Sequence, residues 1–223
     1  MKYVATFTKT GRMIYISHLD LIRVFLRALR MAGLRPEYSN GFNPHPKMGF
    51  ALPLSLGYHS IADYIEFETL AEFDENNAIQ IINSKLPADI RITAFGKKPE
   101  KYNKSLASYV FSANYEIMCE GMYNTPNNME EFFNLDHIFI DKTSKKGKPS
   151  VLDIRDRMLS YRIMKDLKNR MLINIDLRSD SERMLNPGVF FNSYCNKFNI
   201  DIEPLNPVIT RIGIIDNEGN LLV

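Results

Sequence analysis

Alternating hydrophobic and polar positions predict strands along the first half of the chain, and helical periodicity predicts the helices between them. In the first strand, Tyr3, Ala5 and Phe7 alternate with Val4 and with threonines. The expected elements are, in order, strands 2–9 and 13–16, helix 17–33, strands 48–56 and 61–69, helix 74–85 and strand 90–95. This β, α, β, β, α, β order is the split βαβ pattern of ferredoxin-like units.

The same order of elements recurs in the second half, after a polar, lysine-rich segment at 96–105 that is typical of a linker. The expected elements there are strand 109–119, helix 126–134, strands 137–143, 149–154 and 171–178, helix 187–198 and strand 208–216. Segment 155–169 is left open between an irregular helix and a loop. The sequence therefore predicts an α+β chain with two ferredoxin-like units side by side, in domains 1–97 and 106–223.

The helix at 17–33 has the clearest boundaries, because Ser17 and Asp20 have the spacing of a capping box and Gly33 is a typical helix end. Its apolar arc contains Leu19, Ile22, Phe25, Leu26 and Leu29. Arg23, Arg27 and Arg30 fall together on a neighbouring arc. We therefore expect one face of the helix to pack on a sheet and an arginine stripe to face solvent.

The segment Tyr38–Gly57, YSNGFNPHPKMGFALPLSLG, is rich in proline and glycine, so its backbone is constrained without regular secondary structure. Pro44 and Pro46 flank His45 and favour extended backbone on either side of the imidazole. The segment is either a tight connection with no further role or a functional loop, since long irregular loops in compact domains are often functional.

The run SHLDLIRVFLRALRMAG at 17–33, followed by the loop at 38–57, resembles a bacterial family of proteins encoded beside, or fused to the C-terminus of, radical SAM proteins. This radical-SAM-associated, or radical-SAM-linked, family is a domain of unknown function. Shorter features, KKGK, DIR and LNPG, extend the resemblance toward the C-terminus. The resemblance implies a radical SAM enzyme as the partner, and it implies no particular reaction.

Composition removes several classes of function. No apolar run approaches the ~20 residues that span a bilayer, and the N-terminus lacks a signal-peptide core, so we expect a cytoplasmic protein without membrane insertion. Cys119 and Cys195 are far apart, so cysteines alone provide neither a zinc site nor the cluster of a radical SAM enzyme. The common nucleotide-cofactor and hydrolase motifs are absent from the sequence, and we expect no cofactor and no metal.

The net charge of +2 conceals an uneven distribution, with basic segments at 1–50 and 142–170 and an acidic one at 51–95. Such segregation favours a polyanion-binding face, and ordinary solvated surfaces are the alternative. The candidate RNA- or phosphate-binding residues are Arg23, Arg27, Arg30, Asn40, Asn43, Lys47, Lys145, Lys146, Lys148, Arg155 and Arg157. Tyr15, Tyr38, Phe42 and Phe50 are candidates either for base stacking or for core packing.

The candidate catalytic residues are His18, His45 and Asp20, and they also have less specific explanations: a satisfied histidine for His18 and a helix cap for Asp20. Three functions follow. The first is an RNA- or ribonucleoprotein-binding accessory that presents substrate to a radical SAM enzyme. The second is an RNA-processing or RNA-modifying enzyme with His18 and His45 as acid and base. The third is a protein docking module for the radical SAM partner.

Overall fold

The computed structural model describes residues 1–73, 75–121, 125–143, 149–165 and 170–223. The chain is a mixed α+β protein in which strands pair mostly antiparallel. It divides into two compact units, one formed by Met1–Phe111 with Thr210–Val223 and the other by Ser112–Ile209. The predicted domains, 1–97 and 106–223, place the division elsewhere and stay a prediction.

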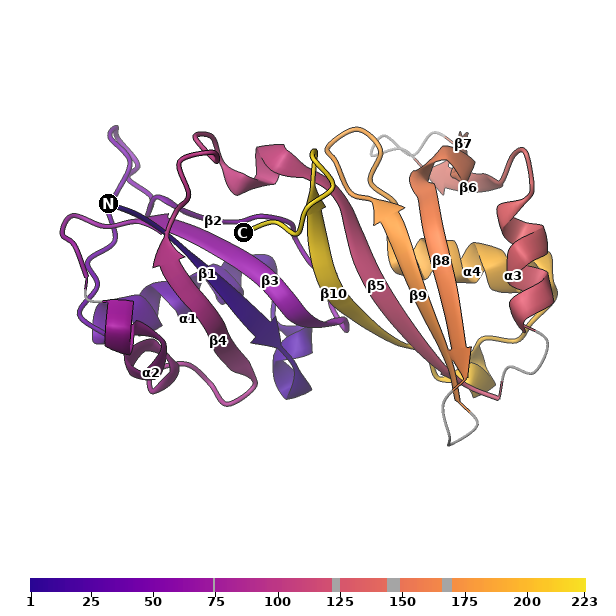
Figure 1. Ribbon diagram of the computed structural model, residues 1–223, viewed down its shortest axis with the longest axis horizontal. Coiled ribbons are helices and arrows are strands. Elements are labelled where there is room, and N and C mark those ends of the chain that lie inside the picture. Colours follow the sequence, from indigo (N-terminus) through magenta and orange to yellow (C-terminus); the bar gives the residue numbers. More distant parts are fainter. Residues whose placement is uncertain (74, 122–124, 144–148, 166–169) are drawn as a thin grey trace. The chain divides into compact units, whose positions relative to one another are not determined.

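The first unit contains strands β1 (Lys2–Lys9), β2 (Met48–Phe50), β3 (His59–Glu68) and β4 (Ile90–Lys97), with helices α1 (His18–Met31) and α2 (Ala78–Asn83) (Figure 1). β1 lies between β3 and β4 and is antiparallel to both, and β2 pairs antiparallel with β3. β10 (Val208–Asp216) returns to this unit, where Thr210 and Arg211 pair with β3 in parallel.

The core of the first unit lies between the two helices and one face of β1. Tyr3, Ala5 and Phe7 on that face pack in one buried cluster with residues of both helices, including Phe25 and Ile82. Phe7 and Phe25 meet edge to face with ring centroids 4.8 Å apart. Of the predicted apolar arc of α1, Phe25 and Leu29 are buried and Ile22 and Leu26 are half-buried, whereas Leu19 is 65% exposed; Leu21 and Ala28 complete the buried face.

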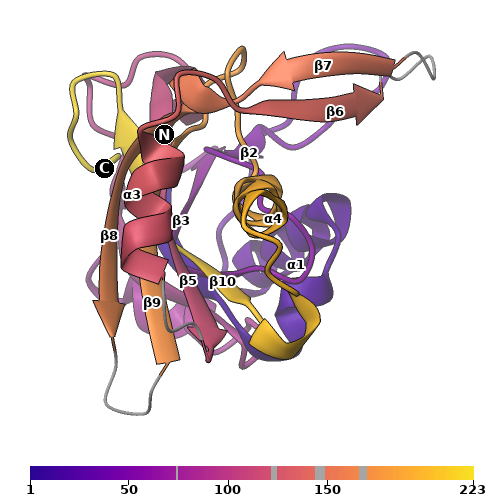
Figure 2. The same ribbon diagram turned by 90° about the vertical axis from the view of Figure 1, so that its right-hand side faces the viewer.

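The second unit contains strands β5 (Val110–Glu120), β8 (Met158–Lys165) and β9 (Arg170–Arg178), in which β9 pairs antiparallel with both neighbours. Helices α3 (Thr125–Phe133) and α4 (Pro187–Lys197) contact each other through Phe132, whose ring lies 6.1 Å from that of Phe190. β6 (Phe139–Thr143) and β7 (Pro149–Asp153) form a separate two-stranded ribbon that reaches away from β8 and β9 (Figure 2).

Four elements differ from the sequence-based expectation. The helix expected at 74–85 is a 3-10 turn at Glu75–Asn77 followed by the short α2. The strand expected at 13–16 is the end of a 3-10 helix, Gly11–Tyr15, because Gly11 turns the chain at φ +51° and the following Ile16 N–H donates to the Met13 carbonyl. The strand expected at 48–56 ends at Phe50. Segment 155–169, left open between helix and loop, contains strand β8. None of the helices in the described ranges is long and apolar enough to cross a membrane.

Candidate functional site

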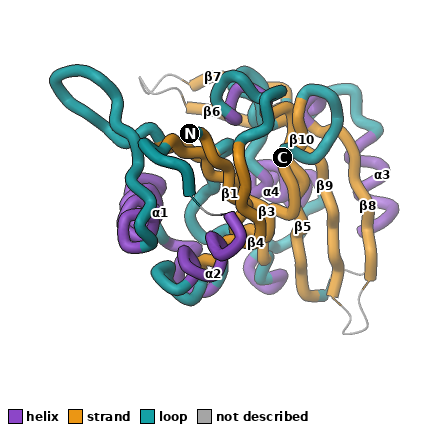
Figure 3. Tube along the Cα trace, turned by 60° about the vertical axis from the view of Figure 1, so that its left-hand side comes forward, coloured by secondary structure: helices purple, strands orange, loops and turns teal. Residues whose placement is uncertain are grey.

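The loop between α1 and β2 projects from the first unit and is closed at its base by a bridge between Tyr38 and Pro46 (Figure 3). Inside this bridge, Ser39 N–H donates to the His45 carbonyl at 2.8 Å and His45 N–H donates to Ser39 Oγ at 3.1 Å. Ser39 Oγ also lies 2.9 Å from His45 Nδ1. These contacts hold both the backbone and the imidazole of His45, so this loop is locally ordered without a helix or a strand.

The tip of the loop exposes an aromatic ring. Phe42 is 113% exposed relative to the reference for its residue type, and its neighbours Asn40 and Asn43 are also exposed. Gly41 precedes the ring at φ +129°, a conformation that favours glycine. The free energy of the system falls when a partner covers a solvent-exposed phenyl ring. The tip of this constrained loop is therefore a candidate recognition surface.

Lys47 and the loop's inner side lie in a mixed-charge environment. Lys47 Nζ donates to Glu37 Oε1 at 2.6 Å and to Glu68 Oε2 at 3.2 Å. These hydrogen bonds, that from Glu37 first, raise the pKa of Lys47. Lys47 is thus a charged residue already surrounded by two carboxylates, and an incoming phosphate would have to compete with them.

An open pocket of about 330 Å³ adjoins the loop within the first unit. Its lining includes His45 and Lys47 and three further lysines: Lys2, Lys98 and Lys104. Glu66 forms part of the wall, and its carboxylate accepts hydrogen bonds from Lys98 Nζ at 2.5 Å and Ser105 Oγ at 2.7 Å. The pocket is therefore basic, with part of its charge offset by protein carboxylates.

The arginine stripe of α1 is exposed as expected, but its members differ in what they contact. Arg23 Nη1 donates to Asp20 Oδ1 at 2.7 Å, and Arg30 donates to the Tyr38 hydroxyl. Arg27 makes no hydrogen bond or ion pair with any residue in the described ranges. Arg27 is consequently the member of the stripe whose guanidinium is most available to a ligand.

The predicted catalytic residues do not meet in one cavity. His18 packs edge to face on Phe50, with ring centroids 5.3 Å apart, and lines a cavity other than the pocket that His45 lines. Asp20 takes part in the cap that Ser17 provides for α1: its N–H donates to Ser17 Oγ at 3.2 Å, and its carboxylate accepts from the Ser17 hydroxyl. The Ser17 hydroxyl and then Arg23 lower the pKa of Asp20. An acid and base pair of His18 and His45 stays a prediction.

Beside His18, the structure brings together charged residues that sequence reasoning missed. Lys9, Asp63 and Arg211 are all buried, at 1%, 4% and 0% exposure. Arg211 Nε donates to Asp63 Oδ1 at 2.7 Å, across 148 positions of sequence. The sequence could have indicated that the Lys9 side chain is buried, because Lys9 continues the alternation of Tyr3, Ala5 and Phe7 and so points toward the core. Nothing local in the sequence marks the partnership of Asp63 with Arg211.

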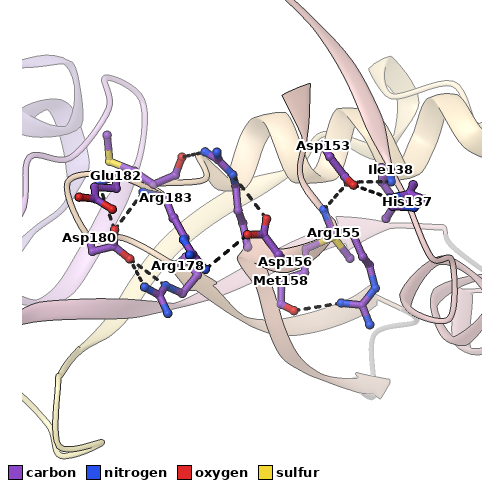
Figure 4. A network of polar contacts seen from close by, with 12 residues as sticks. His137, Ile138, Asp153, Arg155, Asp156, Met158, Arg178, Asp180, Glu182 and Arg183 are labelled. Carbon is purple, nitrogen blue, oxygen red and sulfur yellow. Dashed lines mark hydrogen bonds and ion pairs between the residues drawn. The ribbon is translucent and has the colours of Figure 1, made fainter. Parts of the chain in front are cut away.

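In the second unit, the predicted phosphate-binding arginines contact the protein itself, and Figure 4 shows Arg155 beside Asp153 and Met158. Arg155 Nε donates to the Leu135 carbonyl at 3.1 Å, and its guanidinium lies 5.7 Å from the ring centroid of Phe133. Arg157 Nη1 donates to the Met184 carbonyl at 3.3 Å. Both arginines therefore hold loops together. Lys145, Lys146 and Lys148 lie outside the described residues.

Asp153 is the anchor of the same network, and its titration provides a test. Its carboxylate lies 2.7 Å from His137 Nδ1 and accepts from the backbone N–H of Arg155 and of Ile138, each at 3.0 Å. These contacts, that of His137 first, lower the pKa of Asp153 to about 2. Because folding depresses this pKa, the contribution to stability is present above the ordinary pKa of about 3.9 and is lost as the pH falls through about 2.

We expect NMR titration of side-chain carboxyl carbons to show Asp153 ionising near pH 2. The variant His137→Ala should raise this pKa toward the ordinary value, because it removes the largest contribution. Asp136→Asn, an exposed neighbour of His137, is the control and should leave the titration unchanged. A midpoint near 3.9 in the wild-type protein would contradict the assignment.

Among the described residues, no group of three or more histidine, cysteine, aspartate or glutamate side chains is arranged to hold a metal ion. Cys119 and Cys195 are both free and buried. Burial raises the pKa of Cys119 to about 12 and that of Cys195 to about 11. Both thiols are thus protonated at neutral pH and unreactive.

Comparisons with known proteins identify the family of the chain. No curated protein matches it. Among solved structures, it is similar to the crystal structure of a protein described as a "putative glycine cleavage system transcriptional repressor", with 11% sequence identity, a TM-score of 0.25, and coverage of 97% of this chain and 98% of the other. A family model described as "Uncharacterized protein conserved in bacteria (DUF2344)" matches residues 2–187. The chain therefore belongs to this bacterial family of uncharacterized conserved proteins.

Proposed function

We propose that this protein is an RNA- or ribonucleoprotein-binding accessory that contacts its ligand through the projecting loop of the first unit. The observation that carries the proposal is the fully exposed ring of Phe42 on a loop constrained by the Ser39 and His45 contacts. A ring on an ordered loop loses little conformational entropy on binding, so the free energy of stacking is retained.

A single-stranded RNA suits the chemistry of this surface. Base stacking on an exposed aromatic ring contributes about 1–3 kcal/mol per base and tolerates any sequence. Asn40 and Asn43 beside Phe42 offer hydrogen bonds to base edges, and the guanidinium of Arg27 is available for a phosphate. The 330 Å³ pocket lined by His45 and lysines falls at the lower end of the range for small-ligand sites, which suits one nucleotide.

The proposed partner is a separately encoded radical SAM enzyme, to which this protein would present its substrate. This part of the proposal is supported by the resemblance of segments 17–33 and 38–57 to radical-SAM-associated proteins. An ordered loop with an exposed aromatic tip is equally suited to protein docking, so the experiment has to separate the two ligands.

We expect Phe42→Ala to weaken binding of a fluorescein-labelled, single-stranded oligoribonucleotide by about 5- to 150-fold in fluorescence anisotropy, the loss of one stacked base. Arg27→Ala should weaken binding less and reduce the slope of log K against log salt concentration by about 0.7, the loss of one phosphate contact. Arg162→Ala, which removes an exposed arginine of the second unit, is the matched control and should change neither quantity.

Failure of the wild-type protein to bind RNA at low salt would reject the RNA proposal. Suppose that the wild-type protein does not bind RNA but still co-purifies with a radical SAM enzyme after nuclease treatment. If Phe42→Ala abolishes this association, the loop is a protein docking surface. Equal RNA affinities of wild type and Phe42→Ala would move the RNA interface away from the loop.

We also infer that the chain is built from two ferredoxin-like units, corresponding to domains 1–97 and 106–223. Support comes from the first unit, in which β1 is antiparallel to β3 and β4, and β2 adds to the far edge of β3. This is the order of strands in a split βαβ unit. Expression of residues 1–97 alone would test the domain boundary.

A further inference from the structure

A cluster of buried charges lies beneath the first turn of α1, and its charges do not balance. Arg211 is fully buried, and its guanidinium is satisfied by Asp63 and by two backbone carbonyls, those of Leu52 at 2.8 Å and Pro53 at 3.2 Å. Lys9 adds a second buried cationic group beside the same single carboxylate. Two cations against one anion leave one positive charge without a counter-charge when Lys9 is protonated.

Lys9 itself has no partner in the described part of the chain. Its side chain is 1% exposed, yet its amine makes neither a hydrogen bond nor an ion pair with any described residue. A buried ammonium without a hydrogen-bonded counter-charge is strongly disfavoured. Burial correspondingly lowers the pKa of Lys9, as does the positive charge of Arg211, whereas Asp63 opposes the shift.

Lys9 lines a small cavity of about 10 Å³. Lys9, Asp63 and Leu52 are buried residues of its wall, and the exposed residues His18 and Pro53 mark its outer side. The volume suits one oxygen-sized group, since about 10–15 Å³ is the space that one water needs. His18 and Leu21 of its wall belong to the first turn of α1, a helix of 14 residues, so the cavity adjoins the N-terminal end of the helix, where the dipole is positive.

We propose that this cavity is a binding site for one anionic oxygen of a small ligand, a carboxylate or a phosphate group, held between Lys9 and the first turn of α1. The oxygen supplies the missing counter-charge and accepts a hydrogen bond from the Lys9 ammonium. The remainder of the ligand extends past His18 toward solvent, because the cavity has room only for the anionic group.

The site is distinct from the proposed RNA surface. It lies at the other end of α1 from the contact between Arg30 and Tyr38, and its residues line a cavity separate from the pocket of His45. Loss of RNA binding in Phe42→Ala would leave this proposal untouched, and loss of anion binding would leave the RNA proposal untouched.

The test measures thermal unfolding of the whole chain in a HEPES–chloride buffer, with phosphate or acetate added at constant ionic strength. We expect saturable stabilisation by at least one anion; phosphate alone would identify a phosphate site, and acetate alone a carboxylate site. Lys9→Met should weaken the apparent affinity at least tenfold. Lys85→Met, at an exposed lysine of the same unit, is the matched control and should retain wild-type affinity.

Titration of Lys9 in the wild-type protein provides a second readout that does not depend on a variant folding. His18 from α1, Asp63 from β3 and Arg211 from β10 are the titratable or charged groups that face it. A bound anion stabilises the ammonium, so the nitrogen-15 shift of Lys9 Nζ should titrate at higher pH with the anion than without it. The proposal is overturned if neither anion stabilises the protein, if Lys9→Met is protected like wild type, or if the titration of Lys9 does not move.

Discussion

We expect Asp63→Asn to lower the free energy of unfolding by about 3–5 kcal/mol, to be measured by urea denaturation at pH 7 in a buffer free of phosphate and carboxylates. Asp63 is 4% exposed and is the carboxylate that faces both Arg211 and Lys9. The substitution keeps the shape of the side chain and removes its charge, so the Arg211 guanidinium remains buried without a counter-charge. Lys9 can release a proton in response, but Arg211 cannot.

A double-mutant cycle separates charge balance from packing. Lys9→Met alone should change stability little or raise it, because it removes a buried charge that no described residue pairs. Combined with Asp63→Asn, it should restore part of the lost stability, since the repulsion between Lys9 and Arg211 disappears. Glu72→Gln, at an exposed ion pair with Lys97, is the matched carboxylate control and should have no measurable effect. A fully additive cycle would show that Lys9 is already neutral in the fold.

Phe25→Ala should destabilise the protein by a similar amount, about 3–5 kcal/mol, because it empties the centre of the first unit's core. Phe25 is 0% exposed, and its ring contacts Phe7 at 4.8 Å and Phe50 at 5.8 Å between centroids. Phe50 in turn contacts His18, so the cavity left by Phe25 adjoins the wall of the anion site. Urea unfolding gives the stability, and the anion affinity of the folded protein gives the effect on the site.

Phe42→Ala is the matched control for this substitution, because it removes the same side chain from a fully exposed position in the same unit. It should leave the free energy of unfolding unchanged while weakening RNA binding. Phe25→Ala should do the reverse at temperatures where it remains folded. Equal stability losses in the two variants would mean that the tip of the loop packs against the protein in solution.

Local sequence patterns predicted the elements whose causes are local. The alternation in Lys2–Lys9 became β1, and Ser17 caps α1 as expected. β8 escaped prediction because its pairing with β9 shifts register between Met158 and Ser160, which interrupts the alternation. The strand expected at 48–56 is short because the chain leaves β3 after Ala51, whose N–H still donates to the Tyr64 carbonyl, and the Leu52 and Pro53 carbonyls accept hydrogen bonds from Arg211 instead.

The candidate site divides in the same way. The composition of the loop at 38–57 alone indicated a constrained backbone with an imidazole and an aromatic ring, because proline and glycine act on their own neighbourhood. Only the tertiary structure decided which cations stay available: Arg23 and Lys47 meet carboxylates, whereas Arg27 meets none in the described ranges. Exposure of a charge depends on what folds against it, and the periodicity of one helix carries no information on that.

The sequence by itself determined the succession of strands and helices, the cap of α1 and the stiffness of the loop, since each depends on residues a few positions apart. Tertiary structure alone decided that Lys9, Asp63 and Arg211 share one buried cluster, because β1, β3 and β10 bring together residues as much as 202 positions apart only once the sheet has formed. In water each of these groups would be an ordinary solvated ion, whereas inside the fold the charge of each depends on the other two.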